Sequence, residues 1–395
     1  MLTDRIGRIT PSATLVMTAK AAELRAAGKP VINLSVGEPD FPTPENIRNA
    51  GKRAIDEGHT RYTPEGGTLE LKKAVVKKLS RDNDLHYDTS QILISCGGKH
   101  SLYNACQALF QSGDEVIIFS PYWVSFPDFV SVTGAKPIFV NTDPARQFEP
   151  VMDDLKAKIT SRTKGIIINS PSNPTGGVWS DEAVLKVLEI AETAGVWVFS
   201  DECYEQLTYD RTYISTAMLG ENTEKVLTFQ SCSKTYAMTG WRIGYTAGDE
   251  KVIKAMGKLQ GQSTSNPCSI SQAASIEALT GPHDDVKEMV RQFEKRRDIV
   301  VKRLTAIPGV ACNKPKGSFY SFPDFSSLYG KKDGNGKTLN GSLEFTEYLL
   351  TTKKVAIVPG IAFGADNHAR LSFAASLDKI EEGIKRIQEA VELLQ

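Results

Sequence analysis

The stretch that starts at residue 225 reads Lys225-Val226-Leu227-Thr228-Phe229-Gln230-Ser231-Cys232-Ser233-Lys234-Thr235. Its first half is an apolar run of the kind that forms a buried strand. A lysine framed by small hydroxyl side chains follows, and Arg242 comes soon after. A lysine amine condenses with an aldehyde, and hydroxyl and guanidinium groups hold a phosphate. The stretch therefore indicates a parallel-sheet enzyme whose cofactor is an aldehyde with a phosphate group, as in pyridoxal phosphate.

Such a cofactor needs a carboxylate beside its ring nitrogen, because the ring withdraws electrons well only when that nitrogen is protonated. Asp201 is the candidate, since it directly follows the buried strand pattern of residues 196–200. The carboxyl end of such a strand is where ligands bind in open α/β sheets. Tyr204 follows three residues later and is placed to hydrogen-bond the phenolic oxygen of the ring.

Other strand patterns also end in side chains that suit this cofactor. Asn173 follows the buried strand pattern of residues 165–169 and suits the same phenolic oxygen. Trp123 follows residues 115–119, and its indole suits stacking on the ring. Gly98 lies in Ser95-Cys96-Gly97-Gly98-Lys99, which opens a predicted helix to about residue 111. A helix N-terminus with glycines lets backbone N–H groups approach a phosphate.

The order of the patterns predicts an α/β fold with a mostly parallel sheet flanked by helices, plus a smaller α+β domain. Thr43 and Pro44 are expected to start a helix, Thr43 as its cap. Strands are expected at residues 91–95, 115–119, 136–140, 164–168, 195–200, 225–229, 354–358 and 370–373. Helices are expected from 284 to about 306 and after 376. The predicted domains are 1–42 (N-terminal arm and part of the small domain), 43–282 (large cofactor domain) and 283–395 (small domain).

These motifs resemble the aspartate aminotransferase family, in the bacterial branch of the class I aminotransferases. The resemblance runs over nearly the whole chain, and its strength lies in the order and spacing of many short strings. They are Asn33-Leu34-Ser35-Val36-Gly37-Glu38-Pro39-Asp40-Phe41, Arg61-Tyr62-Thr63-Pro64, Gly97-Gly98-Lys99, Asn173-Pro174-Thr175-Gly176, Asp201-Glu202-Cys203-Tyr204, the Lys234 segment and Arg370-Leu371-Ser372-Phe373.

The resemblance implies a role for each of these residues. It implies that Lys234 is the Schiff-base lysine and the acid–base catalyst, and that Asp201 pairs with the ring nitrogen. Tyr204 and Asn173 are implied to bind the phenolic oxygen, with Trp123 stacked on the ring. The implied phosphate ligands are Gly98, Lys99, Ser231, Ser233, Arg242 and, from the neighbouring subunit of a homodimer, Tyr62. The implied substrate-binding residues are Gly37, Trp123, Asn173, Lys99 and Arg370, the last for the α-carboxylate.

The implied reaction is a ping-pong transamination between aspartate or glutamate and 2-oxoglutarate or oxaloacetate. Lys99 matches a family lysine that meets the distal carboxylate of a dicarboxylic substrate, although a lysine at this turn also suits solvent. Relatives that use prephenate often carry a basic residue before Pro-Ser in the arm, whereas here Thr10 precedes Pro11 and Ser12. Broader aminotransferase specificity, including prephenate or aromatic amino acids, and a pyridoxal-phosphate lyase reaction stay open as alternatives.

Composition narrows the class of protein. Lys+Arg and Asp+Glu both number 47, so the net charge is zero and no basic surplus indicates nucleic-acid binding. The start of the chain lacks the apolar core of a signal peptide, and no apolar run is long enough to span a bilayer. The six cysteines form no C-x-x-C pair, and no metal site is expected. We expect a cytoplasmic homodimer with shared active sites.

The sequence does not match the common nucleotide-binding patterns. The phosphate-loop pattern needs a glycine at 331, where Lys331 stands, and the dinucleotide pattern G-x-G-x-x-G is also missing.

Overall fold

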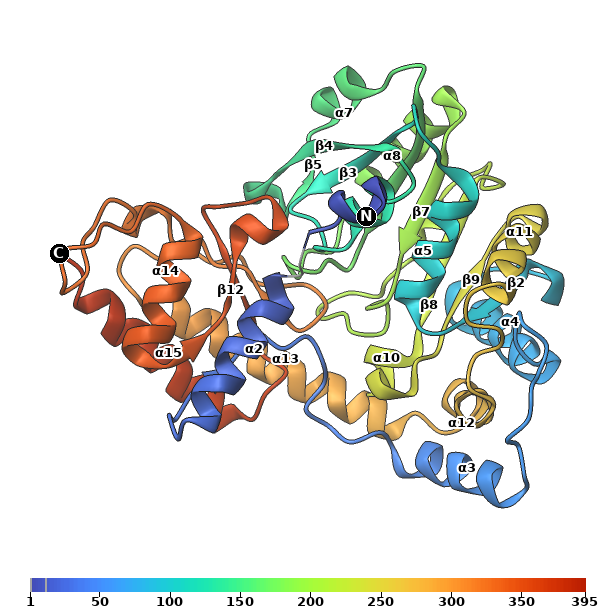
Figure 1. The fold of residues 1–395 in the computed structure, drawn as a ribbon, viewed down its shortest axis with the longest axis horizontal. Helices are drawn as coiled ribbons and strands as arrows, with labels where there is room; N and C mark the ends of the chain where they lie inside the picture. Colours follow the sequence, from blue (N-terminus) through green and yellow to red (C-terminus); the bar gives the residue numbers. More distant parts are fainter. Residues whose placement is uncertain (1, 11–12) are drawn as a thin grey trace.

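The computed structural model describes residues 2–10 and 13–395. Its larger part surrounds an eight-stranded sheet with the order β2-β9-β8-β7-β6-β3-β4-β5 (Figure 1). The strands from β4 across to β8 pair in parallel. Their bounds are β2 (Ile92–Ser95), β3 (Glu115–Ser120), β4 (Lys136–Asp143), β5 (Glu149–Pro150), β6 (Thr163–Asn169), β7 (Trp197–Asp201), β8 (Val226–Ser231) and β9 (Gly244–Ala247).

Both faces of this sheet are buried, which explains why its strands read as continuous apolar runs. Along β3, Val116 and Ile117 belong to different cores, because successive side chains point to opposite faces. Helices α4, α7, α8 and α12 contribute to one core, and α5, α6 and α11 to the other. The helices of this part are α3 (Glu45–Asp56), α4 (Leu69–Asn83), α5 (Gly98–Leu109), α6 (Phe126–Ser131), α7 (Met152–Lys158), α8 (Asp181–Ala194), α9 (Thr216–Leu219), α10 (Cys232–Thr235), α11 (Glu250–Gly261) and α12 (Ser269–Thr280).

The smaller part has its own core, built around aromatic side chains such as Phe293 and Phe345. It holds a parallel pair, β1–β11, and a three-stranded sheet, β10-β13-β12. Helix α13 extends from the larger part into the smaller part (Figure 1). The elements are β1 (Ile32–Asn33), β10 (Tyr320–Ser321), β11 (Val355–Ala356), β12 (Val358–Pro359), β13 (Ala369–Ser372), α13 (Asp284–Leu304), α14 (Ser342–Tyr348) and α15 (Leu377–Glu392).

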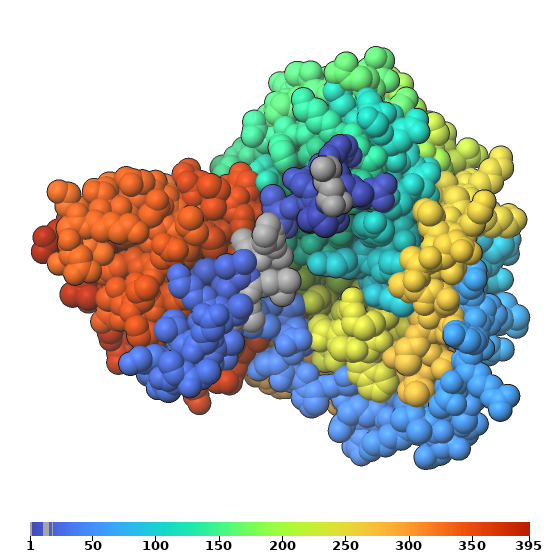
Figure 2. All heavy atoms as spheres, viewed as in Figure 1, coloured from blue at the N-terminus to red at the C-terminus, as the bar shows by residue number. Residues whose placement is uncertain are grey.

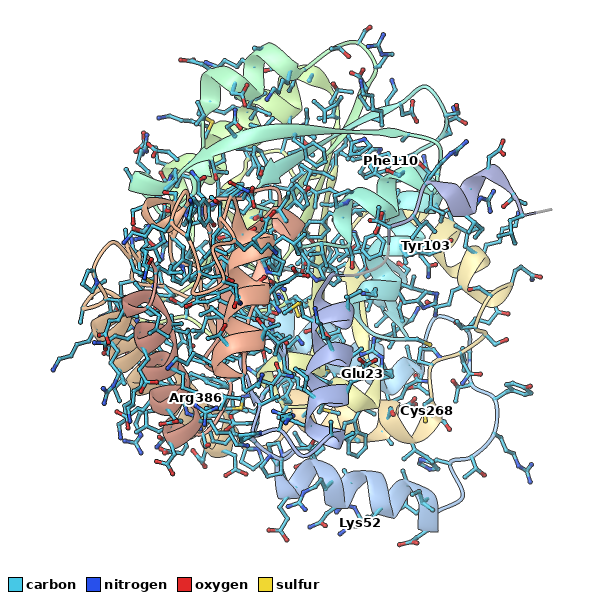
Figure 3. The ribbon with its side chains drawn as sticks, turned by 60° about the vertical axis from the view of Figure 1, so that its left-hand side comes forward. Glu23, Lys52, Tyr103, Phe110, Cys268 and Arg386 are labelled. Atoms are coloured by element: carbon cyan, nitrogen blue, oxygen red, sulfur yellow. The ribbon has the colours of Figure 1, made fainter. Side chains whose placement is uncertain are left out.

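The N-terminal segment touches both parts of the molecule. Helix α1 (Asp4–Gly7) lies on the larger part (Figure 2), where Thr10 donates from N and Oγ1 to Asp128 Oδ1 of α6, at 3.3 and 3.2 Å. Helix α2 (Ala13–Ala26) lies beside α14 (Figure 3), and Lys20 forms an ion pair of 3.7 Å with Glu347. Pro11 and Ser12 lie outside the described residues. The first residues were expected to pack with the C-terminal part, and this holds for α2 but not for α1.

Two details of the sequence-based reading are wrong. Thr43 does not cap a helix, because its Oγ1 donates to the Ala237 carbonyl and accepts from Trp241 Nε1, and α3 starts after Pro44. The strand expected at 354–358 is interrupted at Ile357, which separates β11 from β12. The domain boundaries at 42/43 and 282/283 stay predictions. Among the described residues, no helix is long and apolar enough to cross a bilayer.

Candidate active site

Nearly all the predicted site residues line one cavity of about 300 Å³. It lies where β7 and β8 end, and β13 of the smaller part supplies Arg370 to its wall. The predicted residues on this wall are Gly37, Gly98, Lys99, Trp123, Asn173, Asp201, Tyr204, Ser231, Ser233, Lys234, Arg242 and Arg370. Tyr62 is the exception, because it is not on the wall and its side chain is 91% exposed.

Lys234 extends into the cavity from α10, the short helix that directly follows β8. Ser231 caps this helix, and its Oγ accepts from Ser233 N at 3.1 Å. The Lys234 amine donates to the Gly37 carbonyl at 2.5 Å. This hydrogen bond holds the amine at the cavity wall.

Asp201 is a buried carboxylate at the end of β7, 6% exposed. Burial, with a smaller contribution from the charge of the neighbouring Glu202, raises its pKa to about 7, against the hydrogen bond from Cys203 N at 3.2 Å. A cation placed beside Asp201 would offset this desolvation and hold the carboxylate ionised. A protonated pyridine nitrogen is such a cation.

An anion site lies at the start of α5. Gly97 has φ +91°, and a Cβ there would lie 2.4 Å from Arg242 Nη2. Gly244 is also obligatory, since its Cβ would lie 2.2 Å from Gly98 N. The first N–H groups of α5 have no partner within the helix, and Ser231 and Arg242 line the same end of the cavity. Hydroxyl, guanidinium and backbone N–H donors are the groups that suit a phosphate.

Arg370 lies at the opposite side and is 2% exposed. Its Nη1 donates to Asn173 Oδ1 at 2.9 Å and its Nη2 to the Ser35 carbonyl at 2.7 Å. Its buried Nε has no hydrogen-bond partner among the described residues. Burial lowers the pKa of this guanidinium. A carboxylate bound here would accept a hydrogen bond from Nε and would balance the positive charge of the buried guanidinium.

Trp123 and Lys99 also line the cavity, where they contact each other. The Trp123 ring makes edge contacts with Phe126 and Phe129, at 5.3 and 5.7 Å between ring centroids. The Lys99 amine lies 5.0 Å from the Trp123 ring centroid. Partial burial lowers the pKa of Lys99, and the charges of Arg242 and Lys234 lower it further. An anionic group would relieve this accumulation of positive charge.

The structure also places residues on the wall that sequence reasoning missed, among them Leu102, Val124, Ser125, Asn169, Cys203, Thr239 and Tyr320. Tyr320 is the most informative, because it touches Arg370 and Tyr204. Its sequence context, Gly317-Ser318-Phe319-Tyr320-Ser321-Phe322, is rich in aromatic residues. Aromatic residues favour a strand but give no sign of a site.

The cavity fits pyridoxal phosphate by its chemistry. It offers an amine for an aldehyde, a buried acid for a ring nitrogen, a cradle for a phosphate and an indole beside the ring site. No cluster of metal-ligating side chains occurs in the described ranges 2–10 and 13–395.

Comparison with known proteins identifies the family. The model of "Aminotransferase class I and II" matches residues 29–387, and the chain belongs to this family of pyridoxal-phosphate-dependent enzymes. It is 45% identical to an aspartate aminotransferase of Bacillus subtilis, with 99% of each chain covered. It is 44% identical to an aspartate/prephenate aminotransferase of Cereibacter sphaeroides, with 98% of each covered.

Solved structures confirm the predicted fold. The crystal structure of the aspartate aminotransferase from Rhizobium meliloti matches with a TM-score of 0.97 at 42% identity, covering all of both chains. The Thermus thermophilus aspartate aminotransferase with maleate matches with a TM-score of 0.93 at 37% identity, covering 99% of each. The predicted α/β class, the cofactor and the aminotransferase activity are therefore confirmed.

Proposed function

We propose that the chain transfers the amino group between aspartate or glutamate and 2-oxoglutarate or oxaloacetate in two half-reactions. The observation that carries this proposal is the cavity that holds Lys234 with Asp201 and the phosphate cradle on one side and Arg370 on the other. The Bacillus relative is named for aspartate, and the Thermus relative was solved with maleate, a dicarboxylate. Lys99 supplies a second cation for such a ligand.

When bound, the cofactor accepts the electrons of the broken Cα–H bond and stores the amino group between the half-reactions. Lys234 takes the proton from the substrate Cα and holds it on Nζ. Arg370 orients the substrate by binding its α-carboxylate, with Asn173 and Gly37 beside it. Asp201 holds the proton on the ring nitrogen. Trp123 limits the movement of the ring and excludes water from that face.

The remaining roles follow the same geometry. We assign the phenolic oxygen of the cofactor to Tyr204 and Asn173. We assign its phosphate to Gly98, Lys99, Ser231, Ser233 and Arg242. Tyr62 is exposed and does not line its own cavity, so we assign it to the phosphate of a second copy in a homodimer. A large aromatic side chain that is 91% exposed favours such a contact. We place the enzyme in the cytoplasm, in keeping with its free cysteines.

An absorbance spectrum of the purified protein tests the proposal. We expect a visible band that aspartate alone converts to shorter wavelength, with release of oxaloacetate. The Lys234→Ala variant should lack the band, and Lys254→Ala, at an exposed lysine paired with Glu250, should keep it.

The other outcomes separate the alternatives. A band that ignores aspartate but responds to an aromatic amino acid would overturn the dicarboxylate assignment. Turnover that needs no keto-acid acceptor would indicate a lyase. Acceptance of prephenate as amino acceptor would broaden the specificity, as the name of the Cereibacter relative suggests for that protein. No band after addition of pyridoxal phosphate would overturn the role of Lys234.

A further inference from the structure

Tyr320 lies in the cavity and has no part in the roles assigned above. It is 1% exposed and belongs to β10, which pairs antiparallel with β13. Tyr320 lies opposite Ser372 in this register. Arg370, two residues along β13, therefore points to the same face of the sheet. The pairing of two short strands thus brings the tyrosine ring against the guanidinium.

Tyr320 contacts both halves of the site. Its hydroxyl oxygen is 3.1 Å from that of Tyr204, and its ring centroid is 4.4 Å from Arg370 Cζ. A Cβ at Gly37 would lie 2.6 Å from the Tyr320 hydroxyl, so the glycine leaves room for this contact. Tyr320 therefore bridges the residue assigned to the phenolic oxygen and the residue assigned to the α-carboxylate.

Each tyrosine hydroxyl has one proton, and this determines which of the two tyrosines donates to the other. Each hydroxyl donates once and accepts through its lone pairs. If Tyr204 donates to the phenolic oxygen of the cofactor, its oxygen has to accept from Tyr320. Asn173 completes a parallel path, because its Oδ1 accepts from Arg370 and leaves Nδ2 as a donor.

We propose that Tyr320 is a positioning residue that links Arg370 to Tyr204 and fixes the Tyr204 hydroxyl as a donor to the phenolic oxygen of the cofactor. The guanidinium over the ring face holds the ring by a cation–π contact. The hydroxyl then donates to Tyr204 and strengthens the next bond in the chain by polarisation. This inference rests on the proposed function and adds a residue to it.

Several titratable and charged groups face this pair from the neighbouring elements. Lys234 comes from α10, Asp201 and Cys203 from the end of β7, and Arg370 from β13. Lys99 and Arg242 lie on the phosphate side of the same cavity. Each of them influences the titration of the bound cofactor, so the test compares variants that leave all of them in place.

The test is a pH titration of the visible absorbance of the holoenzyme in four proteins: wild type, Tyr320→Phe, Tyr204→Phe and the double variant. Loss of a donor destabilises the anionic phenolic oxygen, so Tyr320→Phe should raise the pH midpoint by a few tenths of a unit. Tyr204→Phe should raise it further. In the Tyr204→Phe background, Tyr320→Phe should change the pH midpoint little, because the hydrogen bond between the two hydroxyls is already lost.

Tyr348→Phe is the matched control. Its hydroxyl also donates in a buried site, to the Ala390 carbonyl at 2.8 Å, but in the smaller part and off the cavity wall. It should leave the midpoint unchanged. Thermal unfolding of each variant without cofactor verifies that the folds are comparable.

An unchanged pH midpoint in Tyr320→Phe would overturn the inference. It would also be overturned if Tyr320→Phe shifted the midpoint equally in the wild-type and the Tyr204→Phe backgrounds. A wild-type protein without any visible band would overturn the proposed function itself, so the two failures are distinguishable. A second variant, Tyr320→Leu, removes the ring that supports Arg370. It should raise KM for aspartate above the value for Tyr320→Phe, and equal KM values would contradict the contact with Arg370.

Discussion

Arg370 shows how one side chain is prepared for an anion. It is buried, and its Nε hydrogen has no acceptor among the described residues. Two other donors of the same guanidinium hold Asn173 and the Ser35 carbonyl, which fixes the plane of the fork. A buried donor without a partner costs free energy, and a bound carboxylate removes that cost.

We predict that Arg370→Lys raises KM for every amino acid tested, by about tenfold or more. A lysine cannot make the two parallel bonds, and a hydrogen bond to a charged group contributes about 1.5–3 kcal/mol. Steady-state kinetics with aspartate, glutamate and a monocarboxylic amino acid check this prediction. An increase confined to the dicarboxylates would show instead that Arg370 binds the substrate side chain.

Asp201 gives the protein without cofactor a pH-dependent stability. Burial raises its pKa to about 7 in the folded protein, whereas an aspartate in an unfolded chain titrates near pH ~4. Between these values the folded chain holds a proton that the unfolded chain has released. The free energy of unfolding therefore falls as the pH rises through this window.

The variant Asp201→Asn should lack this contribution. We expect it to become progressively more stable relative to wild type as the pH rises from about 4 to about 7, when both are free of cofactor. Thermal unfolding of the two proteins across this range measures the difference. A difference that stays constant with pH would contradict the raised pKa.

At the scale of elements, a buried ion pair ties α4 to the loop after β7 and to β8. The Lys78 amine contacts Glu205 Oε1 and donates to Asn83 Oδ1 and Gln230 Oε1, both at 2.8 Å. Gln230 also donates to Glu202, the neighbour of Asp201, at 3.3 Å. The network thus supports, from behind, the strand ends that carry the site.

Replacement of Lys78 by Met should destabilise the protein by about 3–5 kcal/mol, because it leaves a buried carboxylate unpaired. Denaturant unfolding without cofactor measures this change. Lys186→Met, which breaks an exposed pair with Glu182, should have no measurable effect. The double variant with Glu205→Leu should recover much of the loss, and a double variant as unstable as Lys78→Met would contradict this explanation.

The strands differ in how far their sequences predict them. The parallel strands were predicted because each is a continuous apolar run bounded by turn residues. Strand β9 was missed, although it lies inside the sheet and pairs antiparallel with β2 and β8. Its residues, Gly244–Ala247, are few, start with a glycine and show no periodicity. The contacts with its two neighbours, and not its own propensity, make it a strand.

At the scale of the whole molecule, the position of Tyr62 is the strongest argument for a second subunit. It was predicted to bind the phosphate of the neighbouring subunit, and it is 91% exposed and off the wall of its own cavity. Both observations are satisfied if Tyr62 contacts the cofactor of a neighbouring copy. The exposed apolar side chains Leu2, Ile6 and Ile9 of the N-terminal segment also favour association.

We therefore predict a homodimer in analytical ultracentrifugation. Tyr62→Phe should weaken binding of pyridoxal phosphate by about tenfold, because one hydrogen bond to a charged phosphate is lost. Tyr103→Phe, at another exposed tyrosine, serves as the control and should bind normally. A monomeric protein, or equal affinities in both variants, would refute the shared site.

The sequence by itself determined the class of fold and predicted most of the residues that line the candidate site. Continuous apolar runs located the ends of β7 and β8, and chemistry then selected Asp201 and Lys234 at those ends. Such inferences succeed because they depend on neighbours along the chain, where spacing translates directly into geometry.

Only the tertiary structure decided which residues from distant segments meet. It placed Tyr320 between Tyr204 and Arg370, and it paired Thr43 with Trp241 instead of making Thr43 a helix cap. Each of these outcomes depends on strand register or on the docking of separate parts of the chain. The energy of such contacts comes from partners far apart in the sequence, 116 residues for Tyr204 with Tyr320 and 198 for Thr43 with Trp241, so no local pattern records them.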